Sequence, residues 1–145
     1  MSEKALIDMM KEAIPEINGI DIRTVPPLTL AYIGDSVMDL FVRTYFATTS
    51  HEAVSKLNNR AVKVVNAAFQ AQLLESIDGM LTDEEKDIVR RGRNAKSQTK
   101  PKHADVTDYR LATGLEALLG YLFIMGRSQR LCEIFAEMKN VITQG

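Results

Sequence analysis

Apolar residues recur at spacings of three and four along almost the whole chain, and glycine and proline gather between those stretches. Such spacing places the apolar residues on one face of a helix, because an α-helix turns once every 3.6 residues. No segment shows the strict alternation of a half-buried strand. The pattern therefore predicts an all-α fold, and a length of 145 residues predicts one domain spanning residues 1–145.

Terminal signals divide this pattern into six expected helices. Pro26 and Pro27 are suited to the first turn of the second helix, and Ser50 is a good N-cap for the third. Thr82, three residues before Glu85, gives the fourth a capping box. Residues 20–25 are expected to be extended and 97–104 to form a loop. The expected helices are residues 3–13, Pro27 to about Phe46, Ser50 to about Leu74, Thr82 to Ala95, Val106 to Met125 after a cap at Asp105, and about 129–141 after a cap at Ser128.

Two of these helices have predicted inward faces that can be compared with a structure. In the second helix the inward residues are Leu30, Ile33, Val37, Leu40 and Phe41. In the third they are Val54, Leu57, Ala61, Val65, Ala68 and Leu73. Each set follows the three- and four-residue steps of one helix face, so both helices are expected to pack into a common core.

Composition excludes several classes of protein. The single cysteine, Cys132, cannot form an internal disulfide and has no second cysteine for a zinc cluster, which favours a reducing compartment. No stretch approaches the roughly 20 apolar residues that cross a bilayer, and the first ten residues lack the apolar region of a signal peptide. We therefore expect a cytoplasmic protein without a membrane partner, with Cys132 packed in the core or at an interface.

The charge is unevenly distributed. The net charge is −1, yet residues 90–103 hold six basic side chains and no acid, which leaves 12 basic and 19 acidic side chains elsewhere. A basic segment on an acidic body favours a phosphate backbone as partner. The alternative is a solvated helix end, where the helix dipole favours cations. The candidate RNA-binding residues are Arg90, Arg91, Arg93, Lys96, Lys100, Lys102 and His103.

Two carboxylates lie in unusually apolar helical runs. Asp35 follows Gly34 in LAYIGDSVMDLF, and Glu116 precedes Gly120 by one turn in ATGLEALLGYLF. Glycine inside a helix costs up to about 1 kcal/mol relative to alanine, so its presence suggests close helix packing or access for a ligand. If the two helices pack together, the carboxylates converge and need a compensating cation, for which Mg²⁺ or Mn²⁺ suits oxygen ligands. The alternative is two ordinary polar residues at packing edges.

These runs resemble two motifs of the ribonuclease III family. LAYIGDSVMDLFV is similar to the signature LEFLGDAVL, and TGLEALLGYLF is similar to DTFEALIGAIYL. Together with RGRNAKS and PKHADV, the match is closest to Mini-ribonuclease III, the short relative that consists of the nuclease domain alone, and covers about residues 26–126. The resemblance implies an all-helical homodimer that cuts double-stranded RNA with Mg²⁺, for which Mn²⁺ can substitute, in the maturation of 23S ribosomal RNA precursors.

The resemblance also implies roles for individual residues. Asp35 occupies the position of the catalytic aspartate, and Glu116 that of the catalytic, metal-binding glutamate. Larger members carry two further carboxylates, where this chain has Ala31 and Thr113, so the number of bound metal ions is left open. Asp39, one turn beyond Asp35, is either a further contributor or a solvated side chain.

Two functional hypotheses follow. The first is a Mg²⁺-dependent endoribonuclease in which Asp35 and Glu116 hold the metal and the basic segment grips double-stranded RNA rather than DNA. The second is a catalytically silent RNA-binding module of the same fold in ribosome assembly, which the loss of carboxylates at Ala31 and Thr113 permits. A purely helical interaction protein ranks third, because it explains neither the motifs nor the basic segment.

Overall fold

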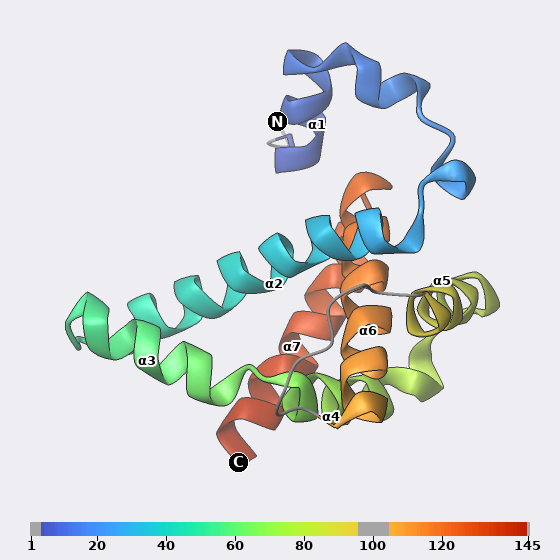
Figure 1. The fold of residues 1–145 in the computed structure, drawn as a ribbon. Coiled ribbons are helices and arrows are strands. Elements are labelled where there is room, and N and C mark those ends of the chain that lie inside the picture. Colours follow the sequence, from blue (N-terminus) through green and yellow to red (C-terminus); the bar gives the residue numbers. More distant parts are fainter. Residues whose placement is uncertain (1–3, 96–104, 145) are drawn as a thin grey trace.

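The computed structural model describes residues 4–95 and 105–144, and its regular structure in these ranges is entirely helical. The predicted all-α fold is therefore confirmed (Figure 1). Within the described ranges no helix combines the length and apolarity needed to cross a membrane. The α-helices are α1 (Leu6–Ala13), α2 (Pro27–Thr49), α3 (Val54–Val64), α4 (Ala67–Ile77), α5 (Asp83–Asn94), α6 (Val106–Ile124) and α7 (Ser128–Gln144), with short 3-10 turns at Pro15–Gly19, Ile22–Thr24 and Asp78–Met80.

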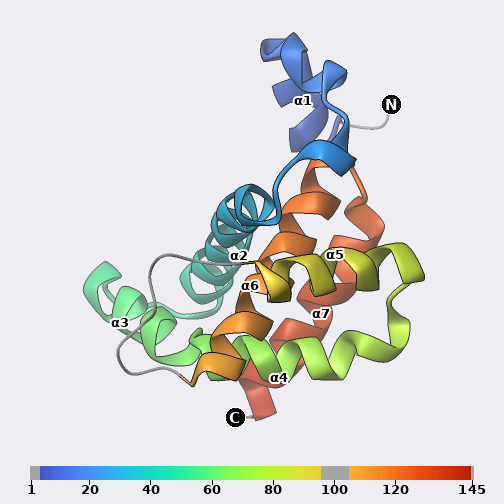
Figure 2. The same cartoon turned by 45° about the vertical axis from the view of Figure 1, so that its right-hand side comes forward.

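Helix α6 is the centre of the fold. It packs against α2, α4, α5 and α7, which surround it in both views (Figures 1 and 2). A helix with neighbours on all sides must be apolar all round, and most residues of α6 from Ala112 to Leu122 are buried. Each fully buried leucine contributes about 1.5–3 kcal/mol relative to an exposed one. The leucines of α6 without solvent exposure are Leu115, Leu118, Leu119 and Leu122.

Glycines allow the backbones of α2 and α6 to touch. A Cβ atom on Gly34 would lie 1.7 Å from the backbone oxygen of Glu116, and one on Gly120 would lie 2.0 Å from the backbone oxygen of Leu30. No side chain fits at such distances. Of the two explanations offered for these glycines, close helix packing is thus confirmed.

A second glycine crossing joins α5 to α6. A Cβ atom on Gly92 would lie 2.9 Å from the Cβ atom of Ala117 and 3.0 Å from the Cα atom of Gly114. At its other end, α5 begins with the predicted capping box, in which Glu85 accepts a hydrogen bond from the Thr82 N–H at 2.8 Å. The buried Glu85 carboxylate also accepts a 3.0 Å hydrogen bond from Arg130 of α7. Both ends of α5 are therefore held in place.

The inward face of α2 differs from the predicted one. Its buried residues are Leu30, Ala31, Gly34, Met38, Val42 and Phe46. Leu40 was expected to face inward but is 58% exposed, and Ile33, Val37 and Phe41 are only partly buried. The helix also continues to Thr49, beyond the expected end at Phe46. The close approach at Gly34 determines which side of α2 faces α6. The face of α2 that carries Gly34 is therefore buried, and Leu40, on another face, is exposed.

The predicted long helix from Ser50 to Leu74 is wrong, because the chain breaks between α3 and α4. Asn66 accepts a 2.9 Å hydrogen bond from the Phe69 N–H and caps α4. A side chain that satisfies the start of a new helix competes with continuation of the previous one. Ser50 ends α2 and does not cap α3. As a result Val54, expected in the core, is 80% exposed, and Ala68 is also exposed.

The remaining local predictions have mixed outcomes. Asp105 caps α6 by accepting the N–H of Thr107 at 2.7 Å, as predicted. Residues 22–24 form a 3-10 turn capped by Asp21 where extended chain was expected. Ser128, expected as the cap, is the first residue of α7. Cys132 is exposed and does not lie in the core.

We expect Gly34→Ala to destabilise the protein by more than about 3 kcal/mol, because its methyl group would overlap a backbone oxygen that only a shift of a whole helix can move. Gly19→Ala is the matched control, since nothing lies within 4 Å of its Cβ position, and its effect should stay within about 1 kcal/mol. Urea unfolding of the three proteins measures both effects. Equal stability of the two variants would contradict the contact between α2 and α6.

Candidate active site

The structure brings Asp35 and Glu116 together across the contact between α2 and α6. Gly34 meets the backbone of Glu116 itself, and Asp35 is the next residue along α2. The two carboxyl groups are joined by a hydrogen bond. Asp35 is exposed while Glu116 is partly buried, so one member of the pair faces solvent and the other lies behind it. The convergence that sequence spacing left open is therefore present.

The pair is electrostatically unfavourable when both members are ionised. Burial, the negative charge of Asp35 and their hydrogen bond together raise the pKa of Glu116 from 4.5 to about 8. Burial is the largest of these causes. A carboxyl group with such a pKa keeps its proton at neutral pH unless a cation is bound nearby. The site therefore favours a bound proton or a bound cation.

The donor set fits a hard divalent cation. Two carboxylates without histidine or thiolate suit Mg²⁺ or Mn²⁺, which bind oxygen ligands and keep several water molecules. Within residues 4–95 and 105–144 no group of three or more histidine, cysteine, aspartate or glutamate side chains is arranged to hold a metal ion. Asp35 and Glu116 would therefore be the carboxylate ligands there, and water or phosphate oxygens would complete the coordination.

The positions of the two missing carboxylates contribute nothing further. Ala31 is buried in the core. Thr113 is also buried, and its hydroxyl donates a 3.0 Å hydrogen bond to the backbone oxygen of Tyr109 in its own helix. Asp39 forms a 3.0 Å ion pair with Arg43 on the exposed side of α2. Of the alternatives for Asp39, the structure shows a solvated, paired side chain.

A polar residue that the sequence interpretation missed lies near Asp35. Gln70 of α4 is 8% exposed and lines a small hollow that Asp35 and Asn58 also line. The only signal in the sequence is a glutamine within the largely apolar run AAFQAQLL. This signal is weak, because glutamine is common on the exposed face of helices.

The described part of the basic segment is the last turn of α5. Arg93 is exposed, Arg91 is partly buried, and Arg90 forms an ion pair with Asp87. Because Gly92 packs on Gly114 and Ala117, which flank Glu116, this turn lies beside the part of α6 that carries the carboxylate. The other candidate RNA-binding residues, Lys96, Lys100, Lys102 and His103, lie outside the described residues.

Comparisons with known proteins agree with this arrangement. A model of the Ribonuclease III domain matches residues 28–127. The chain is 43% identical over 122 residues to Mini-ribonuclease 3 of Symbiobacterium thermophilum, covering 84% of this chain and 94% of that protein. It is 46% identical over 121 residues to Mini-ribonuclease 3 of a Thermoanaerobacter species, covering 83% and 85%.

A solved structure is also similar. The crystal structure of a Fusobacterium nucleatum protein matches with a TM-score of 0.74 and 30% identity, covering 86% of this chain and 97% of that one. The matched family segment includes both carboxylates and the end of α5. The chain therefore belongs to the ribonuclease III family and is an endoribonuclease of that family.

Proposed function

We propose that this endoribonuclease cleaves double-stranded RNA and depends on Mg²⁺ held by Asp35 and Glu116, with Mn²⁺ as a substitute. The observation that carries the proposal is the hydrogen-bonded carboxyl pair, in which burial and the charge of Asp35 raise the pKa of Glu116 to about 8. A site that disfavours its own ionisation in the free protein gains most from a bound cation.

The chemistry divides between the metal and the chain. When bound, Mg²⁺ activates water and stabilises the charge that develops on the phosphate. Asp35, exposed on α2, presents a carboxylate at the entrance of the site, and Glu116 must release its proton before it can act as a ligand. The crossing at Gly34 keeps the two groups on opposed helices at a fixed separation.

The basic end of α5 supports binding of an RNA duplex. Arg93 is exposed on a turn anchored beside Glu116, and the same segment continues through Lys96, Lys100 and Lys102 in the sequence. These cations would neutralise the closely spaced phosphates of an RNA helix, whose A-form shape is recognised with little sequence preference. We expect no activity on DNA.

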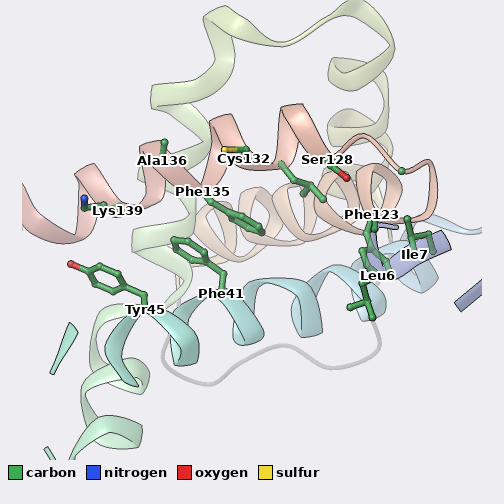
Figure 3. A pocket seen from close by; sticks show the side chains of 13 residues that line it. Leu6, Ile7, Phe41, Tyr45, Phe123, Ser128, Cys132, Phe135, Ala136 and Lys139 are labelled. Atoms are coloured by element: carbon green, nitrogen blue, oxygen red, sulfur yellow. The ribbon is translucent and has the colours of Figure 1, made fainter. Parts of the chain in front are cut away.

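A homodimer is the assembly we propose. The side of α2 that carries Leu40 leaves this leucine 58% exposed, and Tyr32, which lies between that side and Asp35 around the helix, is 80% exposed. This side continues into an apolar groove between α1, α2 and α7. Figure 3 shows Phe41 of α2 facing Phe135 of α7 there, with ring centroids 4.4 Å apart. A second copy would cover this side, and its two-fold symmetry would supply the second site needed to cut the other strand.

We propose a cellular role from the resemblance to Mini-ribonuclease III. That role is maturation of 23S ribosomal RNA precursors in the cytoplasm, with residues 1–145 acting as one nuclease domain. One observation keeps the catalytically silent module as a second candidate. Ala31 and Thr113 are buried and carry no carboxylate, so the site offers fewer acidic ligands than those of larger relatives.

We expect Asp35→Asn and Glu116→Gln each to slow cleavage of labelled duplex RNA in Mg²⁺ by at least about 100-fold, equivalent to about 2.7 kcal/mol in the barrier. Each change removes a ligand charge at nearly constant volume, so duplex binding and helical content should remain. Glu75→Gln, an exposed carboxylate on α4, is the control and should keep full activity. Full activity in either site variant would refute the assignment, and wild-type protein that binds without cleaving would establish the silent module.

The raised pKa of Glu116 predicts that the stability of the folded protein depends on pH. The Glu116 carboxyl loses its proton near pH 4.5 in the unfolded chain and near pH 8 in the folded one, so its contribution falls as the pH rises between these values. Relative to the wild type, Glu116→Gln should therefore gain stability from pH 5 to pH 9 in EDTA. Since one pKa unit corresponds to about 1.4 kcal/mol and the shift between pH 5 and pH 9 amounts to nearly three units, the gain should be on the order of 4 kcal/mol.

Urea unfolding of both proteins at the two pH values measures this gain, and other titrating groups cancel in the difference. Added Mg²⁺ at pH 9 should stabilise the wild type and leave Glu116→Gln nearly unchanged, because only the wild type retains both ligand charges. Parallel pH profiles for the two proteins would show that Glu116 does not titrate abnormally.

Arg93→Ala should weaken duplex binding and lower its salt dependence, because each lost phosphate contact reduces counterion release. The slope of log affinity against log salt should become shallower by a little under one for this variant. It should become shallower still when Lys96, Lys100 and Lys102 are also replaced by alanine. Lys86→Ala, in the first half of α5, is the matched control. Unchanged slopes for all variants would indicate a solvated helix end, and the surface that binds RNA would then lie elsewhere.

A further inference from the structure

A hollow of about 200 Å³ opens beside Asp35, between α2, α3 and the start of α4. Its lining is mixed, with as many polar residues as apolar ones. Asp39 and Arg43 of α2 pair with each other at 3.0 Å, so the guanidinium group is already engaged. The apolar lining residues are Met38, Val42, Ala61, Val62 and Val65, and the polar ones are Asp35, Asp39, Arg43, Asn58 and Gln70.

One residue that lines this hollow, Gln70, carries a side-chain oxygen without a hydrogen-bond donor in the described part of the chain. The side chain is 8% exposed, and its Oε1 atom is buried and accepts no hydrogen bond from any residue in the described ranges. A buried acceptor without a donor destabilises a folded protein. The free protein therefore gains no hydrogen bond from this oxygen, which is consistent with a donor supplied by a ligand.

The position of the hollow narrows the choice of donor. It borders Asp35, which the proposed function places at the phosphate that is cut. On an RNA strand, the O–H donor next to every phosphate is the ribose 2′-hydroxyl, and this group distinguishes RNA from DNA. A lining that is half apolar and half polar suits a sugar, which has both carbon and hydroxyl surface, whereas a phosphate would meet Asp35 and Asp39 with unfavourable charge repulsion.

We propose that this hollow is a ribose subsite in which Gln70 Oε1 accepts a hydrogen bond from the 2′-hydroxyl of a nucleotide next to the cleaved phosphate. The subsite rests on the proposed function, because it requires RNA bound at Asp35. The subsite would distinguish RNA from DNA by the sugar, whereas the basic segment attracts the phosphates of either nucleic acid.

The test is a binding measurement that needs no catalysis. Gln70→Met keeps the length of the side chain and removes the acceptor, and Gln72→Met is the matched control on an exposed position of the same helix. Affinity is measured in EDTA for an all-ribose duplex and for the same duplex with 2′-fluoro sugars, which keep the A-form shape but cannot donate a hydrogen bond.

Gln70→Met should bind the ribose duplex about fivefold more weakly, the effect of one net hydrogen bond, and its preference for ribose over 2′-fluoro should shrink by a similar factor. The free variant should be at least as resistant to urea as the wild type, because an unpaired acceptor has been removed. Gln72→Met should behave as the wild type. The combination of greater stability and weaker binding is one that a purely structural glutamine would not produce.

Unchanged ribose affinity in Gln70→Met, or equal losses for both duplexes, would overturn the proposal. A loss that arises only when Mg²⁺ is present would also overturn it, since the donor would then be a metal-bound water. Single 2′-fluoro substitutions scanned along the duplex with wild-type protein give an independent test, in which the loss should be confined to the sugars flanking the cleaved bond. Wild-type protein without duplex affinity would refute the proposed function itself, and the subsite with it.

Discussion

The contact between the backbones of α2 and α6 is the constraint on which the site depends. Gly34 and Gly120 remove the side chains that would hold the helices apart, and the backbone oxygens of Glu116 and Leu30 occupy the vacated space. Since Asp35 follows Gly34 directly, packing the two helices also places the two carboxyl groups against each other. The close contact between α2 and α6 therefore also produces the unfavourable interaction between the two carboxyl groups at the edge of the core.

Much of the helical framework could be predicted, because its signals are local. The capping box of Thr82 and Glu85 and the cap at Asp105 depend on side chains within three residues of the backbone groups they satisfy. The break at Asn66 was missed because the apolar residues on either side of it continue the same helical spacing. The prediction for Leu40 was wrong because α2 has apolar residues on two faces, and their spacing does not show which face is buried. The face that carries Gly34 is buried, because only there can the backbone of α6 approach closely.

The candidate site was predictable to a different extent. Asp35 and Glu116 stood out as carboxylates in apolar runs, but only the folded chain shows that they share a hydrogen bond and that the pKa of Glu116 rises. Gln70 could not be singled out, since its unpaired oxygen results from α2, α3 and α4 meeting around it. The raised pKa of Glu116 and the unpaired oxygen of Gln70 depend on the packing of several helices, so the residue pattern within one helix cannot predict them.

The carboxyl pair and the Gln70 oxygen have the same physical character. Each includes a polar group that is wholly or partly buried, Gln70 Oε1 in one case and the Glu116 carboxyl in the other, and each lowers the stability of the free chain. The surrounding core tolerates both because α6 is buried along most of its length and does not depend on polar contacts at this edge. If these polar groups bind a ligand as proposed, stability and binding are separated in space, since α6 holds the fold while the polar groups lie at its edge, between α2, α4 and α6.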